Sequence, residues 1–75
     1  MEKLLALLQD IRPEVDFRSE QHLIDDGLLD SLTIMEIVAE ISDNFDIELS
    51  PADIIPANFN SASAMWDMIV RLGGK

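Results

Sequence analysis

Ser31 is the residue whose type and position best suit covalent chemistry. It lies at the start of a predicted helix, directly after Asp30. Because the preceding run Asp25-Asp26-Gly27 is polar and turn-forming, the hydroxyl of Ser31 should be exposed. The start of a helix has free backbone N–H groups and the positive end of the helix dipole, and both favour a phosphate group. Asp30 or Ser31 can also cap this helix, and a serine at a helix start is commonly no more than a cap.

The other chemistry-bearing side chains predict neither a catalytic centre nor a metal site. His22 is the only histidine and the sequence has no cysteine, so a zinc site and a recognisable catalytic triad are both excluded. Asp25, Asp26 and Asp30 lack the ligand spacing and closing glutamate of a calcium loop. We therefore expect a protein that is not an enzyme, with no catalytic residues and no metal, in which any thiol belongs to an attached group.

The charge of the chain restricts its partners. The 75 residues include 15 acidic and 5 basic side chains, which gives a formal net charge of −10. Such a chain repels nucleic acid and anionic lipid surfaces, and it attracts proteins with basic docking surfaces. The apolar start is too short for a signal peptide, and no segment is long enough to cross a bilayer. We expect a cytoplasmic monomer with one domain over residues 1–75, which binds no nucleic acid and does not insert into a membrane.

The first half of the chain predicts two helices joined by a long connection. Residues 2–11 place leucines on one helical face, and Pro13 closes that helix because the residue before a proline avoids helical geometry. Residues 12–29 form a mixed segment that is long for a small domain. Residues 31–45 are the best helix candidate in the sequence.

The second half predicts a short helix and a final longer one. Ser50 followed by Pro51 is typical of a helix start, and Pro56 ends that short helix within about a turn. Residues 58–60 predict a turn, and a last helix should cover about 62–72. No segment alternates convincingly as a strand. The sequence therefore predicts an all-α fold, a small four-helix bundle with three main helices and one short helix.

The predicted helix over 31–45 has two apolar faces. At about 100° of rotation per residue, one stripe gathers the side chains expected in the core, namely Ile34, Ile37, Val38, Ile41 and Phe45. The roughly opposite side carries three apolar residues beside three acids, namely Leu32, Met35, Ala39, Glu36, Glu40 and Asp43. A small apolar patch with an adaptable methionine and an acidic edge is typical of a docking surface. The alternative is that Leu32 and Met35 pack beneath the long first connection.

These features together resemble the acyl carrier proteins. The run Asp30-Ser31-Leu32, followed by Glu36, a series of aliphatic residues and Phe45-Asp46, is similar to the modification motif and second helix of that family. The resemblance covers residues 4–72 and includes the order of the helices. It implies a four-helix bundle of the acyl-carrier type.

The resemblance also implies a cofactor and partners. It makes Ser31 the attachment residue for 4′-phosphopantetheine from coenzyme A, and Asp30 an acid that the modifying enzyme recognises. It assigns the partner-docking face to Leu32, Met35, Glu36, Ala39, Glu40 and Asp43. The implied partners are a phosphopantetheinyl transferase, an acyl- or aminoacyl-adenylating ligase that loads the arm, and an acyltransferase or synthase that unloads it.

The cargo is less clearly defined by the sequence. Gly27-Leu28-Leu29-Asp30-Ser31 resembles D-alanyl carrier proteins of teichoic acid tailoring, and also stand-alone carriers that load amino acids. A fatty-acid carrier, or a carrier for polyketide or peptide synthesis, is the alternative within the family. An acidic helical adaptor or a nucleic-acid mimic without a prosthetic group is the alternative from another class of protein.

Overall fold

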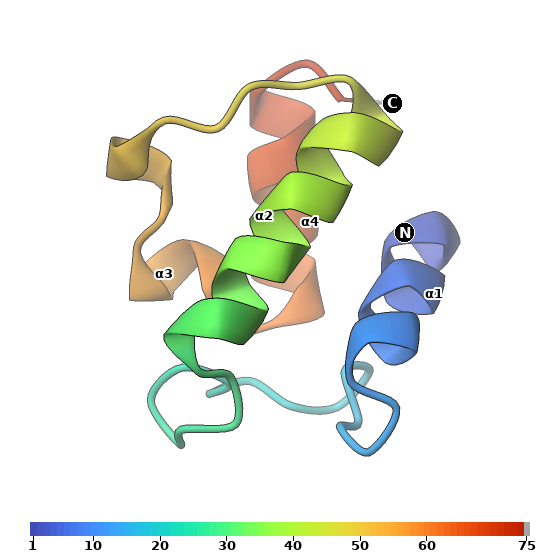
Figure 1. Ribbon diagram of the computed structural model, residues 1–75, viewed down its shortest axis with the longest axis vertical. Coiled ribbons are helices and arrows are strands. Elements are labelled where there is room, and N and C mark those ends of the chain that lie inside the picture. Colours follow the sequence, from blue (N-terminus) through green and yellow to red (C-terminus); the bar gives the residue numbers. More distant parts are fainter. Residues whose placement is uncertain (75) are drawn as a thin grey trace.

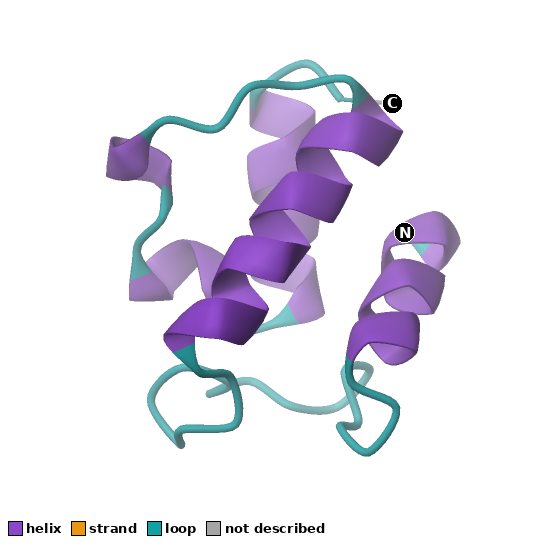
Figure 2. Ribbon diagram, viewed as in Figure 1, coloured by secondary structure: helices purple, strands orange, loops and turns teal. Residues whose placement is uncertain are grey.

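The structure, a computed structural model that describes residues 1–74, consists of helices and connecting loops (Figures 1 and 2). Lys75, the last residue of the predicted domain, lies outside the described residues. The three main helices are α1 (Glu2–Ile11), α2 (Ser31–Phe45) and α4 (Ala62–Arg71). Between α2 and α4 lie a 3-10 turn, η1 (Pro51–Asp53), and a short helix, α3 (Pro56–Phe59). The predicted all-α class is confirmed, and residues 1–74 contain no strand.

The three main helices enclose a single apolar core. Figure 1 shows α2 crossing in front of α4 with α1 at its side; α1 packs against both α2 and α4, and α3 packs against α4. Each main helix contributes side chains with no exposed surface, which are Leu4, Leu8, Ile37, Ile41, Met65 and Ile69. Burying one such aliphatic side chain stabilises a fold by about 2 kcal/mol, so this shared stripe holds the helices together.

Helix α2 buries the stripe that its sequence predicts, with one addition. Ile37, Ile41 and Phe45 are buried, whereas Ile34 and Val38 are half-buried at the edge of the core. Thr33 is also buried, at 3 % exposure, and it is the only polar residue of α2 in this class. A buried hydroxyl needs hydrogen-bond partners, and those of Thr33 lie at the functional site described below.

The predicted short helix is divided into two shorter elements. Pro51 starts the 3-10 turn, and the Asp53 carboxylate accepts hydrogen bonds from the Ser50 N–H and hydroxyl, both at 3.1 Å. Pro56 does not only end this element, because it also occupies the first position of α3, where its fixed φ suits a helix. The predicted turn over 58–60 is therefore wrong for its first two residues. Burial of Phe59 at 1 % exposure favours the extra helical turn.

The long first connection, residues 12–30, is held against the core and against the start of α4. Phe17 and Leu23 are buried at 1 % and 0 % exposure. The Asn60 side-chain oxygen accepts hydrogen bonds from the N–H groups of Ile24 at 2.9 Å and Asp25 at 3.1 Å. Ser61, rather than Asn60, caps α4, since its hydroxyl accepts from the Ala64 N–H. Asn60 is therefore free to fix the middle of the connection.

The far end of α2 is tied to its neighbours through one lysine and one aromatic pair. The backbone leaves the helix in the left-handed region at Asp46, with φ of 54°. Lys3 Nζ donates to the Asn44 carbonyl at 2.8 Å and lies 5.1 Å from the centre of the Phe45 ring. Trp66 of α4 meets Phe45 edge-on, with ring centres 6.0 Å apart. A cation near the last carbonyls also complements the negative end of the helix dipole.

Helix α4 ends one residue earlier than predicted. Leu72, the last residue of the predicted helix, is 37 % exposed and lies outside α4, and Gly73 takes a positive φ of 89° at the exit. That conformation favours glycine at the end of a helix. None of the helices within residues 1–74 has the length and apolar character that a bilayer crossing needs.

Candidate functional site

Asp30, and not Ser31, caps the start of α2. The Asp30 carboxylate accepts a hydrogen bond from the Thr33 N–H at 2.8 Å, while the Asp30 carbonyl accepts from the Ile34 N–H at 2.9 Å. Ser31 is the first residue of the helix, its side chain is exposed, and its hydroxyl has no hydrogen-bond partner within residues 1–74. The sequence allowed either residue to cap the helix; in the structure Asp30 is the cap, and Ser31 presents an exposed hydroxyl.

A tight turn at Gly27 directs the chain to this helix start. Gly27 has a φ of +72°, a backbone conformation that residues other than glycine rarely adopt. Its N–H donates to the Ile24 carbonyl at 3.0 Å, and the N–H of Leu28 donates to the Leu23 carbonyl at 2.9 Å. Leu29 is buried at 4 % exposure, whereas Leu28 is 40 % exposed and does not serve as a core residue. One buried leucine thus fixes the chain two residues before Ser31.

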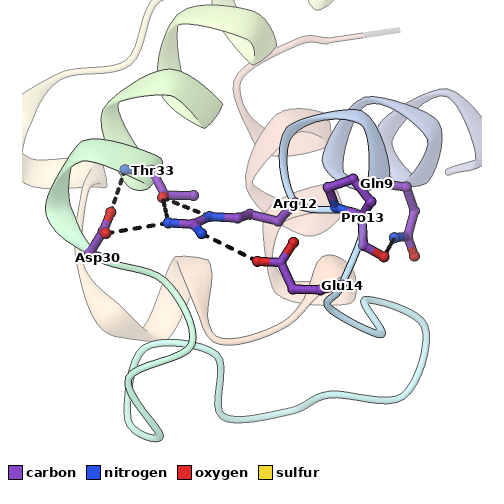
Figure 3. Close-up of polar contacts among 6 residues, drawn as sticks. All are labelled: Gln9, Arg12, Pro13, Glu14, Asp30 and Thr33. Atoms are coloured by element: carbon purple, nitrogen blue, oxygen red, sulfur yellow. Dashed lines mark hydrogen bonds and ion pairs between the residues drawn. The ribbon is translucent and has the colours of Figure 1, made fainter.

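An arginine from the end of α1 binds the cap of α2 (Figure 3). Arg12 Nε and Nη2 both donate to the Thr33 hydroxyl oxygen, at 3.0 and 2.6 Å. Arg12 Nη2 also lies 3.3 Å from Asp30 Oδ2, and Nη1 lies 3.2 Å from Glu14 Oε2. The buried Thr33 hydroxyl therefore has its partners, and the two ends of the first connection meet here.

These contacts lower the pKa of Asp30. The main cause is the hydrogen bond from the Thr33 N–H, followed by the Thr33 side chain; desolvation opposes them, and the charge of Arg12 lowers the pKa by a smaller amount. Each of these contacts favours the charged carboxylate. Asp30 is therefore held as an anion directly beside the exposed hydroxyl of Ser31.

The helix start suits a phosphodiester on Ser31. The backbone N–H groups of Ser31 and Leu32 have no hydrogen-bond partner within residues 1–74, as expected at the first turn of a helix. Free N–H groups and the positive end of the helix dipole stabilise an anion placed there. The described residues thus offer an exposed hydroxyl and a local field that would favour a phosphate attached to it.

The outer face of α2 is exposed along its length. Leu32 and Met35 are 77 % and 55 % exposed, so they do not pack beneath the first connection. The other residues predicted for this face are exposed too: Glu36, Ala39, Glu40 and Asp43. Within residues 1–74 no basic side chain forms an ion pair with these acids. The arrangement therefore leaves an acidic face with an apolar end next to Ser31.

A small apolar hollow lies beside the outer face of α2. It has a volume of about 110 Å³ and is lined by Ile24, Ile34, Ile54, Ile55, Pro56 and Phe59. Ile55, at its rim, is 44 % exposed. A closed apolar cavity of about 150 Å³ holds a molecule the size of benzene, so this hollow accepts only a few carbon atoms.

Two residues of the site were not found from the sequence. Arg12 follows α1 directly and precedes a proline, a position that suggests only a helix end. Thr33 reads as one more position in an aliphatic helix. The sequence does contain one clue to them: Thr33 is a polar residue on the predicted core stripe, and Arg12 is a cation at the end of the preceding helix. Within residues 1–74 no group of three or more acidic, histidine or cysteine side chains could hold a metal ion.

The comparison with known families identifies the class of protein. The family model described as "Phosphopantetheine attachment site" matches residues 2–69. The chain therefore belongs to the phosphopantetheine-binding carrier proteins, as its resemblance to acyl carrier proteins predicted, and this membership implies 4′-phosphopantetheine as a covalently attached cofactor.

The chain is also similar to one curated carrier protein. The chain is similar to aminoacyl carrier protein 2 of Bradyrhizobium diazoefficiens, with 34 % identity over 66 residues, which cover 88 % of this chain and 73 % of that protein. No solved structure matches the chain. The family assignment thus rests on the sequence model and on this relative, and the fold described above agrees with it.

The lowered pKa of Asp30 predicts how stability depends on pH. Because the pKa is lower in the folded than in the unfolded chain, this carboxylate stabilises the fold above about pH 4, and its contribution is lost as the pH falls through the folded-state pKa. Asp30→Asn keeps an amide oxygen that can cap α2 but removes the charge. Urea unfolding, followed by circular dichroism, should show a larger deficit for Asp30→Asn at pH 6 than at pH 3. An equal deficit at both pH values would contradict the assignment.

Proposed function

We propose that this protein carries an activated aminoacyl group as a thioester on a 4′-phosphopantetheine arm attached to Ser31. The observation that carries the proposal is the division of roles at the start of α2: Asp30 caps the helix, and the Ser31 hydroxyl is exposed and unpaired within residues 1–74. The family membership supports the arm, and the position of Ser31 supports the attachment residue.

The residues around Ser31 would hold the arm at its phosphate end only. The N–H groups of Ser31 and Leu32 are free at the first turn of α2, where they and the helix dipole would favour the charge of a phosphodiester on Ser31. When attached, the arm supplies the thiol that the chain itself lacks, because the sequence contains no cysteine. The remaining contribution of the chain is to present this end of the helix to enzymes.

The outer face of α2 is proposed as the surface that those enzymes bind. Its acids, Glu36, Glu40 and Asp43, attract basic side chains, and Leu32 and Met35 offer apolar contact close to Ser31. A transferase that installs the arm, a ligase that loads it and an acyltransferase or synthase that unloads it can each use this face in turn. The protein itself then needs no catalytic residue.

A small aminoacyl cargo, such as D-alanine for teichoic acid tailoring, is favoured over a long fatty acyl chain. The run from Gly27 to Ser31 resembles D-alanyl and amino-acid-loading carriers, and the relative described above is named an aminoacyl carrier protein. A fatty-acid or polyketide carrier therefore remains the second candidate, and the cytoplasm is the compartment proposed for either.

The attachment residue is tested by intact mass. Incubation with coenzyme A and a broad-specificity phosphopantetheinyl transferase should add the mass of one phosphopantetheine group to the wild type and nothing to Ser31→Ala. Ser42→Ala, on the same helix but away from its start, is the matched control and should be modified like the wild type. An unmodified wild type, or an equal gain in Ser31→Ala, would end the carrier proposal.

The cargo is tested on the phosphopantetheinylated protein. A D-alanine-activating ligase with ATP should load it with one alanyl group at a rate at least about tenfold above that of an octanoyl-activating ligase assayed at its own optimum. Each ligase is checked on a carrier protein that it is known to load. Faster octanoyl loading would reverse the order of the two candidates.

The docking face is tested by charge reversal. Glu36→Lys combined with Glu40→Lys should slow modification of Ser31 by about tenfold, mainly through slower encounter with a basic partner. Asp67→Lys together with Glu48→Lys makes the same change in net charge at exposed positions off the outer face of α2 and should have a much smaller effect. Equal losses in the two double variants would mean that only net charge matters, and a loss of helix content would mean that the face has a structural role.

A further inference from the structure

The Thr33 hydroxyl is bound by Arg12 at the start of α2. A threonine hydroxyl has one O–H donor and two acceptor lone pairs. Arg12 Nε and Nη2 both donate to this oxygen, at 3.0 and 2.6 Å (Figure 3). The Asp30 carboxylate accepts a hydrogen bond from the Thr33 N–H at 2.8 Å through one oxygen, and Arg12 Nη2 lies 3.3 Å from its other oxygen. Arg12 therefore holds the residue whose N–H caps onto Asp30 and also contacts the carboxylate directly, so both Asp30 oxygens are oriented by this group of contacts.

Arg12 also closes the first connection at its two ends. Arg12 and Asp30 are separated by 18 positions in the chain, and their side chains lie 3.3 Å apart. The guanidinium is only partly exposed, with 34 % of its side-chain surface accessible, so it is better ordered than an ion pair on the open surface. Asn60 holds the connection at Ile24 and Asp25, several residues before Ser31. Close to Ser31, the tie between α1 and α2 is made by Arg12.

The contacts of Arg12 require the shape of a guanidinium. Its Nε and Nη2 reach one oxygen of Thr33, Nη2 also faces Asp30, and Nη1 faces Glu14, which uses three nitrogens in a planar fork. A lysine carries the same charge on a single nitrogen and cannot make these contacts together. Arg12 thus contributes geometry as well as charge.

We propose that Arg12 is a positioning residue for the modification of Ser31, acting through Thr33 and Asp30 to hold the carboxylate beside the reacting hydroxyl in one orientation. This inference rests on the proposed function, since it assumes that Ser31 receives the arm. Arg12 binds the buried Thr33, whereas the partner-docking residues lie on the exposed side of α2. Its loss therefore lowers the rate within the docked complex and leaves docking unchanged.

Steady-state kinetics with coenzyme A and a broad-specificity phosphopantetheinyl transferase test the proposal. Arg12→Gln should lower kcat by about fivefold, with KM for the carrier within about twofold of the wild type. Arg18→Gln is the matched control: it makes the same substitution in an arginine that pairs with Glu2 at 2.7 Å, and kcat should not change. A loss confined to KM, or an equal loss of kcat in Arg18→Gln, would overturn the proposal.

A double-mutant cycle separates positioning from general stability. In the Asp30→Asn background, Arg12→Gln should change kcat by less than about twofold, because the group through which it acts has been altered. The full loss in this background would show that Arg12 acts independently of Asp30 and would overturn the proposal. If Arg12→Gln does not fold, Arg12→Lys replaces it, since it retains the charge and lacks the fork; the same loss of kcat is expected.

Amide hydrogen exchange gives a readout that does not depend on the transferase. In Arg12→Gln the Thr33 amide, which the Asp30 carboxylate caps, should exchange about threefold faster. The Ala64 amide, capped by the Ser61 hydroxyl in α4, should not change. An unaltered Thr33 amide would overturn the link between Arg12 and Asp30. A wild type that takes up no arm would instead refute the proposed function, while the exchange measurement would still decide whether Arg12 orders Asp30.

Discussion

Burial of one stripe of α2 is the interaction on which the rest of this small structure depends. Ile37 and Ile41 have no exposed surface, and they lie in the same core as the buried side chains of α1 and α4. Because a helix has a fixed angular period, burying this stripe forces Leu32 and Met35 outward. The core thus determines which face of α2 is exposed. A chain of 75 residues can keep so exposed a helix only because the centre of its opposite side is buried in the core.

The start of α2 is fixed by polar contacts in the same way that its middle is fixed by apolar ones. Leu29 fixes the backbone just before the helix, Asp30 caps it, and Arg12 joins that cap to the end of α1. The exposed hydroxyl of Ser31 therefore stands on a rigid support, although the residue itself makes no side-chain hydrogen bond within the described chain. A long flexible arm is best placed on such a support, because the freedom then belongs to the arm and not to its point of attachment.

Much of the architecture was predictable because it follows from local rules. Helical spacing of leucines and isoleucines predicted both ends of α1 and α2 correctly. The rotation of about 100° per residue also separated the buried face of α2 from its exposed face. Prediction failed where long-range packing decides: burial of Phe59 extends a helix through a predicted turn. The contact between Arg12 and Thr33 joins residues 21 positions apart, and no local pattern encodes such a pairing. The cap at Asp30 required the structure because Asp30 and Ser31 are both good capping residues.

The tie between Lys3 and the far end of α2 has a consequence for the lifetime of an activated cargo. Amines and thiolates are the side-chain groups that attack a thioester most readily, and this sequence has no cysteine and only two lysines, Lys3 and Lys75. The amine of Lys3 is bound to the Asn44 carbonyl, about 20 Å along the helix axis from Ser31. The other basic side chains among the described residues are arginines and one histidine, and a guanidinium stays protonated and unreactive. The scarcity of basic residues that makes this surface acidic thus also leaves few side-chain amines that could attack a thioester.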